Sequence, residues 1–224
     1  MRRLVKYVVG QTYKPLLVKY LSGTRQYRYR NIRLEIPPEV FHPGFFFSTK
    51  RLLKFLAGYH LAGKRFLELG AGSGLISIFA AKKGAFVTAS DINKIAVTTL
   101  RKNKFANEVE LNVIESDMFA AIPPQRFDFI AINPPYYKKY PGTAKDYAWY
   151  CGENGEYFQQ LFQGLANYIH PGSHVLMVLC DACDLDMIKS IAALNGFIMH
   201  CVSAKTNLLE KNFIYSIHQN VQGS

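Results

Sequence analysis

Short apolar runs alternate with amphipathic segments from residue 65 onward, and this alternation constrains the fold more than any other feature of the chain. Each run has the length and the β-branched or aromatic content of a buried strand. The runs lie at 65–69, 86–90, 109–116, 127–132, 174–179, 197–206 and 212–219. Strands that alternate with helices form a parallel sheet with helices on both faces, so we expect an α/β fold.

The amphipathic segments that separate these runs predict helices at 73–84, 93–106, 156–172 and 185–196. The first of them ends at Gly84, as a helix with a glycine cap does. The last two strands follow each other without a helix between them, so they should form an antiparallel hairpin. The sequence therefore predicts a Rossmann-like, seven-stranded and mostly parallel sheet that closes with an antiparallel hairpin.

Length and charge limit the number of domains and the kind of partner. The chain has 224 residues, which suits one α/β domain with a modest extension. Its net charge is +11 and its isoelectric point is 9.5. Such a balance favours an acidic partner such as structured RNA or a ribonucleoprotein. A charge that only keeps the protein in solution is the alternative.

The sequence gives little indication of a membrane or a metal. Apolar runs stay shorter than the roughly 18 residues that a membrane span needs, and the first residues do not resemble a signal peptide. We therefore expect a cytoplasmic protein without a membrane partner. Cys180 and Cys183 form one C-x-x-C pair, which is a poor zinc signal on its own. Because Cys180 ends an apolar run, we interpret it as a buried cysteine and expect no metal.

A glycine-rich turn follows the first of these strands in the stretch "ELGAGSG", residues 68–74. Glycines at 70, 72 and 74 let the backbone turn sharply and approach a nucleotide-like ligand near the free N–H groups of a helix. A dinucleotide-binding fingerprint would need its third glycine at Leu75, so pyrophosphate binding is disfavoured. A structural turn without a ligand remains an alternative.

Polar side chains stand at or just after the carboxyl ends of four predicted strands, at one edge of the sheet. They are Glu68, Asp91, Asp117 and Asn133. Ligands of open parallel sheets bind at this edge, where a carboxylate such as Asp91 can accept the hydroxyl groups of a ribose. An acid at a strand end can also simply cap the next helix. Four such residues together favour a binding site.

The stretch "INPPYY", residues 132–137, ends the strand predicted at 127–132. Two consecutive prolines remove two backbone donors and fix two φ angles, so the strand must stop there. Asn133 and Tyr136 are thereby expected on a stiff corner beside the ligand edge.

The succession of "ELGAGSG", "SDIN", "ESDMF" and "INPPY" resembles an S-adenosylmethionine-dependent methyltransferase of the small-domain group. This group includes the HemK/PrmC glutamine methyltransferases and N6-adenine methyltransferases, and the resemblance spans roughly residues 40 to 220. It implies the class I methyltransferase fold and S-adenosylmethionine as the cofactor. The cofactor-binding residues that it implies are Glu68, Gly70, Ala71, Gly72, Gly74, Asp91, Ile92, Asp117, Met118 and Asn133. Among them, Asp91 takes the ribose, and Asp117 with Met118 takes the adenine.

The corner also suggests a mechanism, with Asn133, Pro134, Pro135 and Tyr136 as the catalytic residues. An amide nitrogen is a poor nucleophile because its lone pair is delocalised. The Asn133 side-chain oxygen and the Pro134 carbonyl can accept both N–H groups of a planar –NH2 and aim its lone pair at the methyl group. Tyr136 can stack on the flat acceptor, and the mechanism requires no metal.

Aromatic residues are the candidates for the acceptor pocket. We expect Phe46 and Phe47 to wall it, together with Tyr136 and Tyr137, although an ordinary core position is an alternative for the phenylalanines. The stretch "AWYCGENGEYF" resembles a glycine-rich segment of HemK-type proteins, with Cys151 in place of one glycine.

The first 34 residues contain nine Lys or Arg residues and no acidic residue, interleaved with five tyrosines. Basic groups for phosphates and aromatic rings for unstacked bases are typical of an RNA-binding surface. Tyrosines that pack on the domain beneath a solvated basic face are the alternative. We predict an extension over residues 1–40 and the methyltransferase domain over 41–224.

Three functions remain open at this point. The first, slightly favoured by the resemblance, is N5-methylation of glutamine on a translation protein such as a release factor or a ribosomal protein. The second is N6-methylation of adenine in tRNA or rRNA, which the basic segment over residues 1–34 favours. The third is a non-catalytic protein that binds RNA or a partner. We expect a monomer or a small oligomer.

Overall fold

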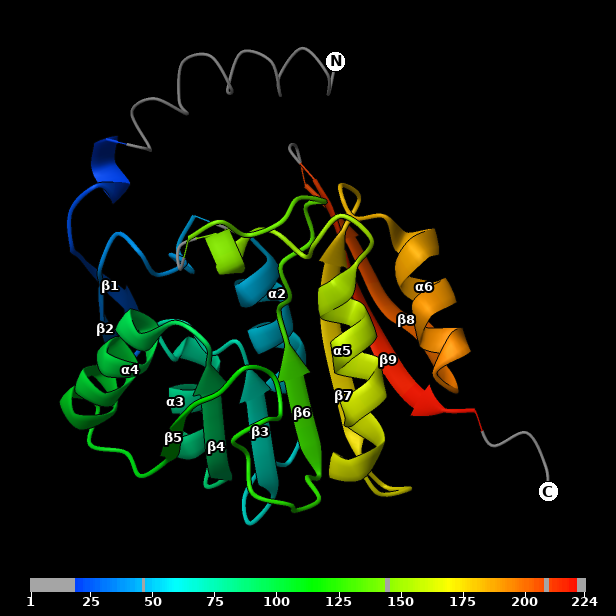
Figure 1. Ribbon diagram of the computed structural model, residues 1–224. Helices are drawn as coiled ribbons and strands as arrows, with labels where there is room; N and C mark the ends of the chain where they lie inside the picture. The colour runs from blue at the N-terminus through cyan, green and yellow to red at the C-terminus, as the bar shows by residue number, and fades with distance from the viewer. Residues whose placement is uncertain (1–18, 46, 144–145, 208–209, 221–224) are drawn as a thin grey trace.

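The computed structural model describes residues 19–45, 47–143, 146–207 and 210–220. At its centre is a seven-stranded sheet in the order β5-β4-β3-β6-β7-β9-β8. The strands are β3 (Arg65–Leu69), β4 (Phe86–Asp91), β5 (Asn112–Glu115), β6 (Phe129–Ile132), β7 (His174–Cys180), β8 (Phe197–Thr206) and β9 (Lys211–Gln219). The first five are parallel, and β9 runs antiparallel to both of its neighbours, β7 and β8. The predicted sheet and its closing hairpin are thus confirmed (Figure 1).

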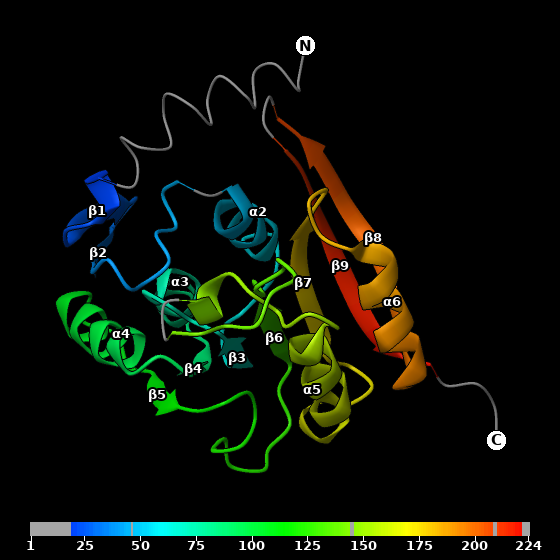
Figure 2. The same ribbon diagram turned by 45° about the horizontal axis from the view of Figure 1, so that its top comes forward.

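Helices cover both faces of this sheet, as predicted (Figures 1 and 2). They are α2 (Phe47–Leu56), α3 (Leu75–Lys82), α4 (Lys94–Ala106), α5 (Glu156–Leu165) and α6 (Leu185–Leu194), with short 3-10 turns at Asp146–Ala148 and Ala166–Tyr168. One core cluster joins α2, α3 and α4 to the sheet, and a second joins α5 and α6 to the opposite face. The central strands bury both faces, with Phe129 and Ala131 of β6 in one cluster and Ile130 and Ile132 in the other, whereas each helix buries one apolar face.

Several predicted elements are shorter than expected, among them one strand and one helix with an evident local reason. The strand predicted at 109–116 is formed only over β5, because Asn107, Glu108 and Val109 donate their N–H groups to the last carbonyls of α4. The helix predicted at 156–172 ends at Leu165 and continues as a 3-10 turn before Pro171. At β5, the hydrogen bonds that close the end of α4 take up the start of the predicted strand. At α5, the chain tightens into a 3-10 turn and Pro171, which cannot continue a helix, follows.

A hairpin of β1 (Arg25–Tyr29) and β2 (Ile32–Ile36) stands beside α4 at the edge of the domain (Figures 1 and 2). Two buried asparagines, Asn103 within α4 and Asn107 at its C-cap, pair with the backbone of β2. The Asn103 side chain binds both the N–H and the carbonyl of Glu35, and Asn107 does the same for Arg33. These bonds satisfy polar groups of β2 that would otherwise form an open sheet edge.

The same hairpin contributes to the core of the domain. Ile32, Leu34 and Ile36 are at most 2 % exposed and belong to the cluster that contains α2 and α3. Tyr27 and Tyr29 pack against that cluster, so within the described residues the alternative of tyrosines packed on the domain holds for these two rings. The boundary predicted at residue 40 stays a prediction, and residues 1–18 lie outside the described part.

In the described residues, α2 to α6 are all too short or too polar to span a membrane.

Candidate active site

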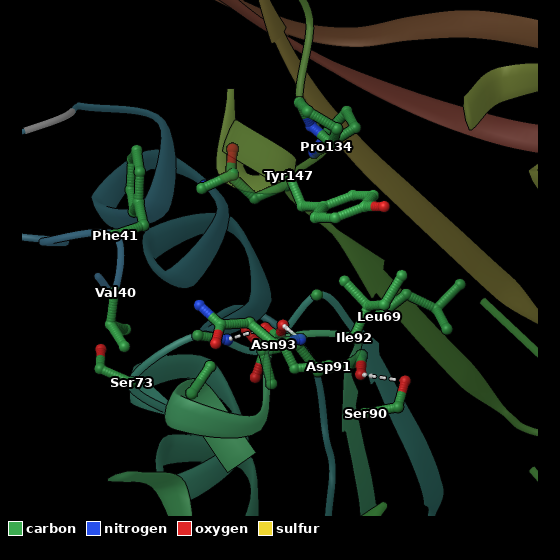
Figure 3. Close-up of a pocket in the computed structure, with 18 of the residues that line it drawn as sticks. Val40, Phe41, Leu69, Ser73, Ser90, Asp91, Ile92, Asn93, Pro134 and Tyr147 are labelled. Carbon is green, nitrogen blue, oxygen red and sulfur yellow. Dashed lines mark hydrogen bonds between the residues drawn. The ribbon is translucent and has the colours of Figure 1, made fainter. Parts of the chain in front are cut away.

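A cavity opens at the carboxyl edge of the parallel strands, where β3 and β6 lie side by side and their connections leave in opposite directions. Doubly wound sheets bind their ligands at such a switch point. The lining comes from the ends of β3, β4, β5 and β6, together with residues 39–41, Pro43 and residues 147–149 (Figure 3). The predicted residues Glu68, Gly70, Ala71, Gly72, Asp91, Ile92, Asp117, Met118, Asn133, Pro134, Pro135 and Tyr136 all line it.

The glycine turn at 70–74 uses its glycines for different purposes. Gly70, Gly72 and Gly74 all have a positive φ, at 69°, 54° and 84°. A Cβ on Gly74 would lie 1.9 Å from the Leu100 Cδ1 atom, so this position needs glycine for the packing of α3 against α4. A Cβ on Gly70 would meet nothing within 4 Å, so its glycine leaves open space beside the cavity. Gly74 itself does not line the cavity, and its role is structural.

Asp91 holds the glycine turn and the start of α4 together. Its Oδ2 atom accepts from the Gly72 N–H at 2.8 Å, and its Oδ1 atom accepts from the Asn93 N–H at 2.9 Å. Burial raises the pKa of the Asp91 carboxyl group. Asn93 is the N-cap of α4, so Asp91 does not serve as the cap. The second lone pair of each carboxylate oxygen can still accept a ligand hydroxyl.

Glu68 lies at the base of the cavity with 5 % of its surface exposed. Its Oε2 atom accepts from both the backbone N–H and the hydroxyl of Ser77 in α3. Burial raises the pKa of Glu68 to about 8, and the nearby Asp91 contributes to the increase. A carboxyl group that changes its ionisation near neutral pH can respond to a cationic group bound beside it.

Asp117 and Met118 form the third part of the cofactor edge. Asp117 is exposed, and Met118 has a φ of 46°, a left-handed conformation that is uncommon for a residue other than glycine. The Ser116 hydroxyl donates to the Met118 carbonyl at 2.9 Å and holds this turn. Strained turns of this kind gather at ligand sites.

The corner after β6 is held from two sides. The Asn133 Nδ2 atom donates to the Thr49 Oγ1 atom of α2 at 3.2 Å. The N–H groups of Tyr136 and Tyr137 both donate to the Trp149 carbonyl, at 3.2 and 2.9 Å. Thr49 was missed in the sequence, because it lies 84 positions before Asn133. With its amide nitrogen bound to Thr49, Asn133 is left with its oxygen as the acceptor for a substrate.

The aromatic walls differ from those predicted. Phe41, Tyr147, Trp149 and Tyr157 line the cavity, and Figure 3 shows Phe41 and Tyr147 on opposite parts of its rim. The predicted wall residue Phe47 is 43 % exposed on the first turn of α2 and is not among the lining residues. Folding of the 147–157 region over the corner brings in rings that the local sequence pattern could not assign.

The remaining predicted wall residues are placed as follows. Tyr137 is 44 % exposed and does not line the cavity, although its ring lies 4.8 Å from that of Tyr136. Phe46 lies outside the described residues. The neighbouring Phe45 packs against His42, with ring centroids 4.7 Å apart, so it forms part of the packing beneath the hairpin.

The cysteine pair lies behind the corner. Cys180 and Cys183 are both buried, with their sulfur atoms 3.8 Å apart, so the interpretation as buried cysteines is confirmed. The Cys183 thiol lowers the pKa of Cys180 to about 7, and the Tyr136 hydroxyl contributes to this decrease. Burial raises the pKa of the Tyr136 hydroxyl, so this hydroxyl stays protonated and neutral. Within the described chain, clusters of three or more His, Cys, Asp or Glu residues that could bind a metal are absent.

The cavity fits S-adenosylmethionine by the chemistry of its lining. Asp91 offers acceptors for ribose hydroxyls, the open space at Gly70 admits the ligand close to the backbone, and Glu68 can respond to a bound cationic group. The Met118 turn and the exposed Asp117 border the position expected for the adenine. These assignments of residues to parts of the cofactor stay predictions.

Comparisons with known proteins agree with this geometry. Residues 32–151 match the family model described as methyltransferase small domain. A provisionally named protein N5-glutamine methyltransferase of Methanocaldococcus jannaschii is 36% identical over 150 residues, which cover 64% of this chain and 74% of the relative. A ribosomal RNA small subunit methyltransferase C of Hamiltonella defensa is 29% identical over 119 residues, covering 52% of this chain and 35% of that protein.

Among solved structures, the complex of Mtq2 and Trm112 from E. cuniculi, responsible for the methylation of the translation termination factor eRF1, has a similar fold. The TM-score is 0.62 at 18% identity, with 81% of this chain and 99% of the other covered. The chain belongs to the methyltransferase small domain family. The predicted class I fold, the methyltransferase class and the dependence on S-adenosylmethionine are thereby confirmed.

Proposed function

We propose that this protein transfers a methyl group from S-adenosylmethionine to the side-chain amide nitrogen of a glutamine in a protein of the translation machinery. The observation that supports this most is the fixed corner at Asn133, which lines the cofactor cavity and whose amide nitrogen is bound to Thr49, so that its oxygen is the atom left to accept from a substrate. The relative from M. jannaschii supports glutamine as the acceptor, and the termination-factor complex supports a translation protein. A cytoplasmic location stays a prediction.

Each step of the proposed mechanism rests on residues of the corner. When bound, S-adenosylmethionine would supply an electrophilic methyl group by breaking its methyl–sulfur bond, and the methylated amide nitrogen would release one proton to water. The Asn133 oxygen and the Pro134 carbonyl accept the two N–H groups of the glutamine amide and turn its lone pair toward the cavity. Tyr136 covers the flat amide, and the aromatic rings of the rim reduce access of water. Positioning of this kind can contribute about 7 to 11 kcal/mol to catalysis.

Methylation of the adenine N6 atom in tRNA or rRNA is the second candidate. Adenine presents the same planar –NH2 group to the corner, and the basic outer face of the β1–β2 hairpin favours an RNA partner. The relative from H. defensa supports ribosomal RNA as a class of substrate.

The two candidates can be separated by one assay. Cells that lack the gene provide unmethylated ribosomes, translation factors and tRNA, which are incubated separately with the purified protein and isotopically labelled S-adenosylmethionine. Mass spectrometry then identifies the modified residue. We expect a label on a glutamine side chain, with transfer by the Asn133→Ala variant reduced at least about 100-fold. A label on N6 of adenine would replace the proposed acceptor by the second candidate, and transfer to an oxygen or carbon atom would contradict both.

A further inference from the structure

The β1–β2 hairpin and the end of α3 form a basic surface, defined by Arg28, Arg30, Arg33, Lys82 and Lys83, whose five side chains are exposed. We propose that this basic surface binds the phosphate backbone of a folded, base-paired RNA and thereby docks the enzyme on a ribonucleoprotein. The proposal rests on the proposed function, which it deepens by naming what presents the acceptor to the enzyme.

The first argument is a pair of like charges on the hairpin. Arg28 and Arg33 are direct cross-strand partners and stand on its outer face. Like charges at directly opposite positions destabilise paired strands. The Arg28 Nε atom donates to the Arg30 carbonyl at 3.0 Å, and neither Arg28 nor Arg33 forms an ion pair with another described residue. This arrangement favours an anion from outside the chain.

The second argument is a hollow that continues the surface. Arg30, Lys82 and Lys83 all line it, where the turn of the hairpin meets the end of α3. The Lys82 Nζ atom donates to the Asn107 carbonyl at 3.1 Å, and the Asn107 side chain binds the backbone of Arg33, so the parts adjoin. A concave site with three cationic groups fits a phosphate, which a guanidinium can bind through two N–H groups.

Nearby acidic groups leave this surface positive. Three of them are matched by lysines of α4, in the pairs Lys94–Glu115 at 3.7 Å, Lys102–Glu35 at 3.6 Å and Lys104–Glu110 at 2.8 Å. Glu108, which follows the end of α4, offsets only one of the five positive charges of the basic surface. A partner with many anionic groups close together is therefore complementary to it.

The packing of the tyrosines in this region favours base-paired over single-stranded RNA as the ligand. Tyr27 and Tyr29 pack against the core, and the Arg25 guanidinium covers the Tyr20 ring at 4.1 Å. The two tyrosines of the hairpin are therefore not free to stack on splayed bases, which single-stranded RNA recognition uses, and Arg25 already occupies one face of the Tyr20 ring. Closely spaced phosphates remain as the ligand, and each phosphate contact also releases counterions, a gain that scattered protein carboxylates do not provide.

The test measures binding by the full chain without cofactor. Three probes are compared by fluorescence anisotropy: an RNA duplex of about 16 base pairs, its single strand, and polyglutamate. The triple variant Arg28→Gln, Arg30→Gln and Arg33→Gln is compared with Lys54→Gln, Lys189→Gln and Lys205→Gln, which removes the same charge from exposed sites elsewhere. We expect the duplex to bind best, and the arginine variant to weaken its binding at least about ten-fold while the slope of log affinity against log salt falls by up to about three.

Folding of the arginine variant is checked by its melting temperature, which should not fall because the repulsion between Arg28 and Arg33 is removed. Equal loss of duplex binding in both triple variants, or tighter binding of the single strand or of polyglutamate, would overturn the proposal. The proposed function is tested separately, because duplex binding needs no methyl transfer. A parent that binds the duplex but methylates no glutamine would contradict the function and leave the docking surface standing.

Discussion

The cavity has a cofactor half, around Glu68 and Asp91, and an acceptor half, around Asn133, and the two halves are built differently. On the cofactor half, backbone geometry is fixed within the chain: Asp91 holds two N–H groups and Glu68 is bonded twice to Ser77. On the acceptor half, the side chain of Asn133, which positions the substrate amide, has one hydrogen bond, to Thr49, and its oxygen accepts none from the described residues. The cofactor half is thus completed before any ligand binds, whereas the acceptor half keeps its polar oxygen for the substrate.

This difference predicts that changes in the two halves have separable effects. The largest effect should come from Asn133→Ala, which removes the acceptor oxygen and leaves Asp91 and Glu68 in place. We expect kcat to fall about 10²- to 10³-fold, as is typical for a lost preorganised polar group, with cofactor affinity within a few-fold. Asn112→Ala, at an exposed position of β5, is the matched control and should leave both unchanged.

The opposite variant, Asp91→Ala, should weaken cofactor binding strongly in calorimetry. If Asn133→Ala lost affinity to the same extent as Asp91→Ala, the two halves would not be independent and the assignment of roles would be wrong.

The second prediction separates two roles of glycine in the cofactor half, the packing of Gly74 and the open space beside Gly70. Gly74→Ala places a Cβ 1.9 Å from Leu100 at a positive φ, so we expect a loss of about 3 kcal/mol in the free energy of unfolding, measured by urea denaturation. Gly70→Ala keeps open space around its Cβ and should lose only about 1 kcal/mol from backbone strain, while cofactor affinity falls. Equal destabilisation by both variants would contradict the separation of packing from binding.

Most of the sheet could be predicted because its signals are local. The apolar runs and their separating helices placed six of the seven strands within two residues of their bounds, and the polar residues at their ends located the cavity. The β1–β2 hairpin was missed although Tyr27, Tyr29, Ile32, Leu34 and Ile36 follow a period of two along its strands. Each strand has only five residues, so the alternation is too short to stand out among the basic residues of this segment.

The rest of the site depends on contacts between distant segments. Thr49 meets Asn133 only after α2 packs on the sheet, and Trp149 reaches the corner through the backbone carbonyl that it offers to Tyr136. Phe41 replaces the predicted Phe47 in the wall because the entry to α2 turns Phe47 to solvent. A local sequence pattern contains no information on contacts between distant segments, because these contacts depend on tertiary packing.

The third prediction concerns Glu68 and the pH dependence of the cofactor half. Burial raises the pKa of Glu68 from 4.5 to about 8, so the folded protein keeps a proton that the unfolded chain releases between these values. The free energy of unfolding should therefore fall as the pH rises from about 5 to 8, by about 1 kcal/mol per pH unit, and level off above 8. Below a pH of about 4.5, Glu68 is protonated in both the folded and the unfolded state, so it no longer changes the free energy of unfolding with pH.

Glu68→Gln removes the ionisable group while its oxygen can still accept from Ser77. Its stability relative to the parent should rise between pH 5 and 8, as followed by urea denaturation without cofactor. A parallel pH course of the two proteins would show that Glu68 is ionised in the folded state.

The smallest effect is expected at Thr49, the single support of Asn133 within the described chain. Thr49→Val keeps the shape of the side chain and removes the hydroxyl, so the Asn133 amide loses one neutral hydrogen bond and rotates more freely. Such a bond contributes about 0.5 to 1.5 kcal/mol, so we expect kcat to fall by roughly three- to ten-fold with cofactor affinity unchanged. Thr49→Ser retains the hydroxyl and should restore most of kcat, although it loses a methyl group from a buried position. If Ser and Val lowered kcat equally, Thr49 would act through packing of α2 alone, and the acceptor half would not depend on a hydrogen bond to orient its amide.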